Sequence, residues 1–214
     1  MKQHDSIAYR AIPSIDGGYS LSAEYDGNIE ITSYDSEGNP TTRTYGKTTK
    51  RQYKRFKIQI CPIKEMYLIA KHINLDNAAV IMCSSYPIVE EKIKPIKNKM
   101  CLDFDDTTLT RSTRAFNIDM ANQIRAFIDS LGEEITVLYV CCNSGESRST
   151  ALSAAIMRYV KMSDKDIWKN PYYHPNPLVY KLQCKAFGVF ISKLGVRKRA
   201  RMNEKALRRK MERK

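Results

Sequence analysis

One stretch, residues 135–160, constrains the fold of this chain more than any other. An apolar run that ends at Val140 leads into a short polar loop, and an Ala-rich helical pattern that begins at Arg148 leads out of it. A strand, a tight loop and a helix in this order can hold an anion, because the loop amides point inward and the helix N-terminus adds its positive end. We therefore expect residues 142–148, called here the Cys142 loop, to bind an anion such as phosphate.

The side chains of the Cys142 loop are suited to nucleophilic attack on phosphorus. Cys142 opens the loop and Arg148 closes it, so the thiol should lie beside both a helix N-terminus and a guanidinium, which lower the pKa of a thiol. The planar guanidinium can bind two phosphate oxygens, and Ser149 can donate a hydrogen bond to the sulfur. Gly145 allows a positive φ and a close approach of the backbone to the ligand.

The loop resembles the phosphate loop of the cysteine-dependent protein tyrosine and dual-specificity phosphatases, especially their small atypical microbial and phage members. The resemblance lies in the pattern Cys142-x-x-Gly145-x-Ser147-Arg148-Ser149-Thr150-Ala151. It implies a protein-tyrosine-phosphatase-like fold and a phosphomonoester hydrolase whose cysteine forms a phosphocysteine intermediate. It also implies that the phosphoryl group is bound by Asn143, Ser144, Gly145, Glu146, Ser147 and Arg148.

Cleavage of a phosphomonoester also requires a general acid that protonates the leaving oxygen. Asp105 and Asp106 follow an expected strand whose carboxyl end should lie near Cys142. The Phe104-Asp105-Asp106 stretch resembles the Phe-x-Asp stretch of the small microbial members, and this resemblance assigns the acid role to Asp106. Asp105 is the alternative general acid. The remaining alternative is that the aspartate only caps a helix or a turn and takes no part in a reaction.

One position departs from the family pattern. The family usually has a histidine immediately before the nucleophile, where this chain has Cys141. That histidine is thought to orient the loop and hold the thiolate, so its loss brings the depth of the Cys142 pKa shift into question. We expect Cys141 to point to the other side of its strand, away from the ligand. A phosphate-binding module without turnover is therefore an alternative to an enzyme.

The region from Phe56 to Gly195 alternates apolar strand-like runs with helical patterns. This alternation predicts an α/β domain, residues 56–195, with a mainly parallel central sheet flanked by helices. Strands are expected at 57–61, 78–83, 99–104 and 135–141, and helices at 64–73, 117–131, 148–160 and 177–194. Asn117 can cap the second of these helices and Asn176 can begin the last one, whose apolar residues recur every four positions up to the stop at Gly195. Ligands of such sheets bind beyond the carboxyl ends of the strands, where Cys142 is placed.

Two segments flank the α/β domain. Residues 1–55 form an N-terminal extension, with an expected β-hairpin whose turn is at 35–40. Residues 196–214 form a basic C-terminal tail with ten Lys and Arg and two Glu, in a chain of net charge +13. The tail could bind nucleic acid, which would suit a phosphatase acting on RNA 5′ ends. It lacks the aromatic side chains that stack on bases, however, and a solvated tail is the alternative.

The composition of the chain bears on its cellular location and on its need for a metal or cofactor. The six cysteines show no paired spacing of a disulfide framework or a zinc site, and most of them lie in strand-like runs, as expected in a reducing cytoplasm. No apolar run of about 18 residues is present and no signal peptide is evident, so we expect a cytoplasmic protein without a membrane span. We expect phosphorylated proteins as substrates, and no metal or cofactor, because the loop supplies the positive charge.

Overall fold

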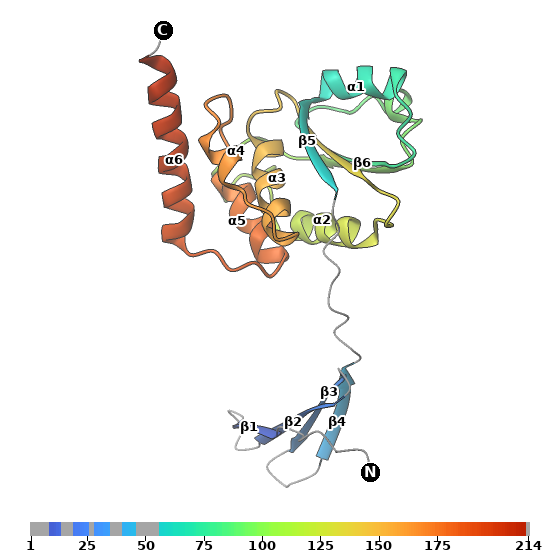
Figure 1. Ribbon diagram of the computed structural model, residues 1–214, viewed down its shortest axis with the longest axis vertical. Helices are drawn as coiled ribbons and strands as arrows, with labels where there is room; N and C mark the ends of the chain where they lie inside the picture. Colours follow the sequence, from blue (N-terminus) through green and yellow to red (C-terminus); the bar gives the residue numbers. More distant parts are fainter. Residues whose placement is uncertain (1–8, 14–18, 26–27, 35–39, 46–55, 213–214) are drawn as a thin grey trace, which may run out of the picture. The chain divides into compact units, whose positions relative to one another are not determined.

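The computed structural model describes residues 9–13, 19–25, 28–34, 40–45 and 56–212 (Figure 1). The chain divides into two compact units, Met1–Tyr53 and Lys54–Lys214. The first unit contains an antiparallel sheet with the strand order β1-β2-β3-β4. Its strands are β1 (Tyr9–Pro13), β2 (Tyr19–Tyr25), β3 (Asn28–Tyr34) and β4 (Pro40–Tyr45). Strands β3 and β4 pair on either side of the predicted turn; residues 35–39 of that turn lie outside the described residues, whereas Pro40 belongs to β4.

The second unit is built on a four-stranded parallel sheet with the strand order β5-β8-β6-β7. The strands are β5 (Lys57–Pro62), β6 (Ala78–Ser84), β7 (Asn98–Asp103) and β8 (Val137–Cys142). Strand β8 lies between β5 and β6, so the strand that leads into the Cys142 loop is an inner one. The predicted α/β fold with a parallel central sheet is confirmed.

Helices cover both faces of this sheet (Figure 1). They are α1 (Ile63–His72), η1 (Glu90–Ile93, a 3₁₀ turn), α2 (Ile118–Ser130), α3 (Arg148–Tyr159), α4 (Lys165–Lys169), α5 (Pro177–Ala186) and α6 (Lys193–Met211). Helix α1 and η1 lie on one face, whereas α2, α3 and α5 lie on the other. Helix α6 packs on α4 and α5. Among the described helices, none combines the length and apolarity that crossing a bilayer requires.

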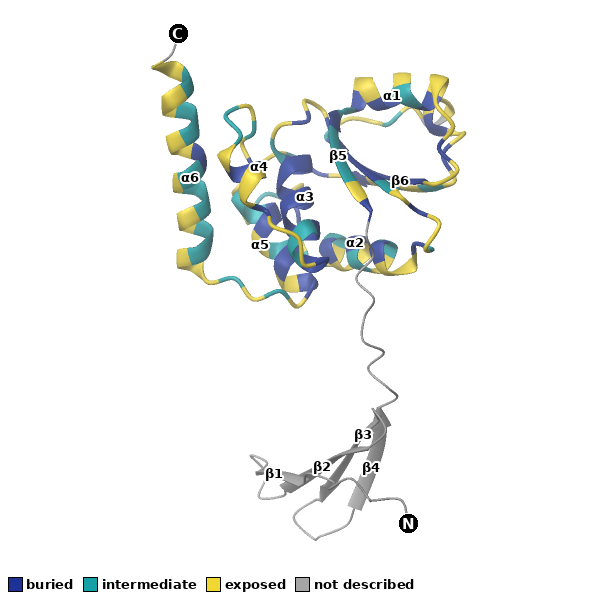
Figure 2. Cartoon of the chain, viewed as in Figure 1, coloured by how far each residue is buried: buried dark blue, intermediate teal, exposed yellow. Residues whose placement is uncertain are grey.

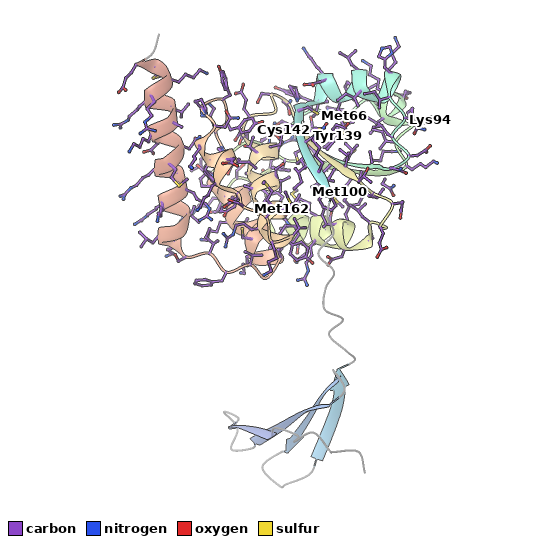
Figure 3. The ribbon with its side chains drawn as sticks, viewed as in Figure 1. Met66, Lys94, Met100, Tyr139, Cys142 and Met162 are labelled. Carbon is purple, nitrogen blue, oxygen red and sulfur yellow. The ribbon has the colours of Figure 1, made fainter. Side chains whose placement is uncertain are left out.

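Strand β8 sends alternate side chains into two separate cores, as the period of a strand requires. Leu138, Val140 and Cys142 lie in the core that includes α2, α3 and α5. Tyr139 and Cys141 lie in the core under α1, where Figure 3 labels Tyr139 and Met66 near one another. Strand β6 is buried along its whole length, which follows from coverage of both faces.

Two asparagines begin helices in the way that the sequence predicts. The Asn117 side chain accepts hydrogen bonds from the backbone N–H groups of Asp119 and Met120, at 3.0 Å each. The Asn176 side chain accepts from the second and third residues of α5, whose first residue is a proline. Each cap satisfies amides that lack a partner inside the helix.

The predicted helix at 177–194 is wrong in extent, because the chain breaks it at Gly188. Gly188 has φ +67°. Its N–H donates to Lys185 O at 3.0 Å, and the next N–H, of Val189, donates to Cys184 O at 2.9 Å. This pair of bonds ends α5 in a Schellman motif. The predicted stop, Gly195, instead lies in the first turn of α6, and residues 196–211 of the basic tail are helical.

A buried carboxylate, Asp164, joins the C-terminal helices. Arg199 of α6 donates to both of its oxygens, at 2.6 and 3.0 Å, and the hydroxyl of Tyr180 in α5 donates to one of them at 2.6 Å. Asp164 is only 3% exposed. Burial raises the pKa of Asp164, but the bonds from Arg199 and Tyr180 outweigh it, so that the pKa is lowered. The carboxylate therefore holds α5 and α6 together at the start of α4.

We expect Asp164→Asn to lower the free energy of unfolding by about 3 kcal/mol, because it leaves the Arg199 guanidinium without its counter-ion. The pKa of Asp164 is lower in the folded protein than its ordinary value of 3.8. The carboxylate therefore stabilises the folded state fully when the pH is above 3.8, and this stabilisation is lost as the pH falls through the pKa of the folded protein. Urea unfolding at neutral and acidic pH measures both effects. The exposed Asp166→Asn is the control and should change stability by less than about 0.5 kcal/mol. Equal stability of Asp164→Asn and the unchanged protein at neutral pH would contradict this account.

Candidate functional site

The Cys142 loop joins β8 to α3 at the carboxyl end of the parallel sheet. Figure 3 labels Cys142 near β5, whose last residue, Pro62, pairs with Cys142 across the sheet. Cys142 is 1% exposed and belongs to the core that includes α3. The thiol therefore lies at the floor of the loop, at the edge of the sheet where the sequence analysis places it.

Hydrogen-bond donors surround the Cys142 sulfur. The Ser149 hydroxyl oxygen lies 3.1 Å from it, as the sequence predicts. Burial raises the pKa of the thiol, but the Ser149 hydroxyl and the backbone N–H groups of Ser149, Ser147 and Gly145 donate to the sulfur and lower the pKa below its ordinary value. These contacts favour the thiolate, the nucleophilic form of cysteine.

The guanidinium of Arg148 is folded inward over the loop and is 4% exposed. Its Nη1 donates to Phe104 O at 2.6 Å and to Ser85 Oγ at 2.9 Å, and its Nη2 donates to Asn143 Oδ1 at 2.6 Å. The buried Nε donates to no atom of the described residues. The guanidinium is thus fixed by neutral acceptors and retains a donor that an oxyanion could use.

Neighbouring groups bind the carbonyls of the loop. The backbone N–H of His174 donates to Glu146 O at 2.8 Å. The Thr150 hydroxyl lies 2.7 Å from both Glu146 O and Ser147 O and is their donor. Because these carbonyls have partners outside the loop interior, the amides are left facing the sulfur. The arrangement is a ring of N–H groups around an anion position.

Gly145 adopts the positive φ that the sequence predicts, +75°. A Cβ at this position would lie 2.9 Å from Pro62 N and 3.0 Å from Cys61 C. The close approach of the backbone at Gly145 is therefore to the end of β5, and not to the ligand, where the sequence predicts it. A side chain here would push the loop away from the sheet, in addition to straining the backbone.

Of the two candidate acids, Asp106 faces the loop and Asp105 does not. Asp106 Oδ1 accepts from Ser147 Oγ at 2.9 Å and from Asn176 Nδ2 at 2.8 Å. Its other oxygen, Oδ2, bonds to none of the described residues. Asp105 instead accepts from Arg114 Nε at 3.2 Å. The structure thus brings Asp106 to the Cys142 loop and pairs Asp105 with a surface arginine.

Asn176 is part of the site, although its sequence position predicts for it only the start of a helix. Its Oδ1 caps α5, while its Nδ2 donates to Asp106 Oδ1 and to Thr107 O, the latter at 3.2 Å. Asn176 is 4% exposed. A carboxylate cap could accept but not donate, so the choice of asparagine at this cap was the signal for a second partner.

Cys141, which stands where the family has histidine, lies in the other core. Its sulfur is 3.4 Å from the sulfur of Cys61. The contact with Cys61 and burial raise the pKa of Cys141, so this thiol is neutral. Its side chain points away from the Cys142 loop, as predicted. Within the described part of the chain, no three His, Cys, Asp or Glu side chains group so that they could hold a metal ion.

Comparison with known proteins finds distant similarity only. No protein-family model matches the sequence, and no curated protein matches it. A crystal structure of PTPMT1 in complex with PI(5)P is similar, with 14% identity and a TM-score of 0.43 over 62% of this chain and 90% of that chain. A second PTPMT1 crystal structure has 16% identity and a TM-score of 0.41 over 69% and 96%. At these values the similarity leaves the activity of this chain open.

We expect Ser149→Ala to raise the pKa of Cys142, because it removes a hydrogen bond that stabilises the thiolate. The midpoint of the pH dependence of Cys142 alkylation by iodoacetamide should rise by about one pH unit, the effect of one hydrogen bond to a charged group of roughly 1.5 kcal/mol. The pH dependence of the alkylation rate, followed by mass spectrometry of the Cys142 peptide, measures the shift.

Ser153→Ala is the matched control for this measurement. Ser153 is a buried serine one turn further along α3, and its hydroxyl has no partner among the described residues. Its replacement should leave the alkylation profile unchanged. A profile of Ser149→Ala that coincides with that of Ser153→Ala would show that the serine does not act on the sulfur.

Proposed function

We propose that this protein is a phosphomonoester hydrolase of the protein tyrosine or dual-specificity type, acting through a phosphocysteine at Cys142. One observation carries the proposal: a thiol of lowered pKa lies among inward-facing amides, beside a buried guanidinium whose Nε is unpaired within the described residues. Phosphoryl transfer requires a nucleophile below the phosphorus and donors around its oxygens, and this arrangement supplies both.

In the first step the Cys142 sulfur attacks phosphorus and the bond from phosphorus to the leaving oxygen breaks. The loop amides and Arg148 Nε bind the remaining phosphoryl oxygens. The contacts of the Arg148 Nη atoms with Phe104, Ser85 and Asn143 support this role, because they fix the guanidinium plane before substrate arrives. The loop and Arg148 supply positive charge, so we expect no requirement for a metal or cofactor.

Asp106 protonates the leaving oxygen in our scheme. Its Oδ1 is held by Ser147 and Asn176, which leaves Oδ2 to carry the proton toward the substrate. In the second step a water molecule attacks the phosphocysteine and gives its proton to the Asp106 carboxylate, so that inorganic phosphate leaves and the thiolate returns. The resemblance of the loop to protein phosphatases supports phosphorylated proteins as the substrates.

We expect the unchanged protein to hydrolyse p-nitrophenyl phosphate in the presence of EDTA, and Cys142→Ser to lower kcat by about 10⁴-fold or more, because the nucleophile is lost. Release of p-nitrophenol measures both. The exposed cysteine variant Cys101→Ser is the control and should keep the unchanged rate. Hydrolysis that survives Cys142→Ser would overturn the scheme. An unchanged protein that binds phosphate without turnover would instead be a phosphate-binding module.

The two aspartates should separate in a second experiment. Asp106→Asn should lower kcat by about 10²- to 10³-fold with phenyl phosphate, and by less with p-nitrophenyl phosphate, whose better leaving group needs the proton less. Asp105→Asn should stay within about threefold of the unchanged rate, because it removes only an exposed ion pair with Arg114. The reverse order of the two effects would assign the acid to Asp105.

A further inference from the structure

Helix α6 presents a basic surface that the proposed reaction does not use. The helix contains nine Lys and Arg and one Glu. Two of the cations are engaged with the body of the domain: Arg199 binds Asp164, and Lys210 lies 3.6 Å from the ring centre of Tyr172. The other seven cations are exposed. Six of them lie beyond the first turn of the helix and are called here the basic face: Arg197, Lys198, Arg201, Lys205, Arg208 and Arg209.

The basic face occupies one side of α6. Its members follow one another at steps of one, three or four residues, and at 100° per residue all six fall within about 120° of the helix circumference. From Arg197 to Arg209 the face spans about 18 Å. Figure 2 shows the exposed side of α6 turned away from α4, and Figure 3 shows nitrogen-tipped side chains along it. No ion pair joins the six to a carboxylate of the described residues.

The opposite side of α6 is fastened to the domain. Besides the Arg199–Asp164 pair, the buried Asn203 donates from Nδ2 to Asn170 O at 3.3 Å and to Tyr173 O at 2.8 Å. The cations therefore stand on a helix that is fixed at two points along its length. Binding a partner to such a surface orders fewer groups than binding it to a free basic tail, and so costs less entropy.

The chemistry of the basic face favours a phosphate backbone as the partner. The face has no aromatic side chain that could stack on an unpaired base. It also has no large apolar side chain that could enter a bilayer, since the exposed apolar residues of α6, Leu194 and Met211, lie at its two ends. Four of the six cations are arginines, whose planar donors match phosphate oxygens.

We propose that the basic face of α6 binds the phosphate backbone of double-stranded nucleic acid, without contacts to the bases. A duplex presents a phosphate about every 3.4 Å along each strand, and the basic face presents a cation about every 6 Å or less along a rigid rod. This inference goes beyond the proposed hydrolase function and is independent of Cys142. Together the two functions would concentrate the hydrolase on substrates that lie on nucleic acid.

The test measures binding of the full chain to a fluorescent duplex of about 20 base pairs over a series of salt concentrations. If most of the six cations contact phosphates, log K should fall against log salt with a slope of about −4 to −5. The fourfold variant Arg201→Gln, Lys205→Gln, Arg208→Gln, Arg209→Gln should reduce the slope by about 3 to 4. It should also weaken binding at least tenfold at about 100 mM salt.

A second fourfold variant removes the same charge from another face of the domain. Lys57→Gln, Lys64→Gln, Lys71→Gln and Lys94→Gln replace exposed lysines on β5, on α1 and after η1. This control should keep both the slope and the affinity. Thermal unfolding and p-nitrophenyl phosphate hydrolysis report whether either variant has lost its fold or its site. If the fourfold α6 variant unfolds, the double variant Arg201→Gln, Lys205→Gln provides the test, and it should reduce the salt slope by half as much.

Three results would overturn the inference. The first is a slope that the α6 variant leaves unchanged, and the second is an equal loss in the control variant, which would show dependence on net charge alone. The third is tighter binding to vesicles of phosphatidylserine and phosphatidylcholine than to the duplex at the same salt, which would make a membrane surface the partner. A protein that binds the duplex through α6 but hydrolyses no phosphomonoester would retain this inference and lose the proposed function.

Discussion

The buried guanidinium of Arg148 is the interaction on which the rest of the site depends. A cation that is 4% exposed is costly to bury, and its partners among the described residues are the neutral oxygens of Phe104, Ser85 and Asn143. No carboxylate of the described residues forms an ion pair with it. The nearby thiol of lowered pKa can supply a compensating negative charge there. The fold thus keeps a guanidinium at the Cys142 loop without a neutralising carboxylate among the described residues, and such a positive charge is a precondition for binding a phosphoryl group.

The support for this site extends through the whole C-terminal half of the domain. Asn203 of α6 holds the backbone at Asn170 and Tyr173, and the next residue, His174, donates its N–H to Glu146 in the Cys142 loop. Asn176, two residues further on, holds Asp106. One short segment, residues 170–176, therefore contacts α6, the Cys142 loop and Asp106. These hydrogen bonds connect α6 with the Cys142 loop through residues 170–176.

The sequence correctly predicted those parts of the structure that depend on residues close together in the chain. The strand, loop and helix around Cys142, the positive φ of Gly145 and both asparagine caps follow from residues close in sequence, and all were predicted correctly. The break at Gly188 was not, because an apolar recurrence every four residues continues across it while the Schellman bonds that end α5 leave no mark in hydrophobicity. The choice between Asp105 and Asp106 depended on Arg114 and Asn176, and a contact with a residue 70 positions away cannot be read from local pattern.

The alternation of side chains along β8 explains how the chain accommodates Cys141 in the place of a histidine. Position 141 faces the core under α1, where a small neutral thiol packs against Cys61. A histidine side chain there would be larger and would need a polar partner in an apolar layer. With cysteine at position 141, the groups that stabilise the Cys142 thiolate are the Ser149 hydroxyl and the loop amides, which lie on the same side of β8 as the Cys142 sulfur. In the proposed reaction, the activation of Cys142 would therefore depend on the loop amides and on the first turn of α3.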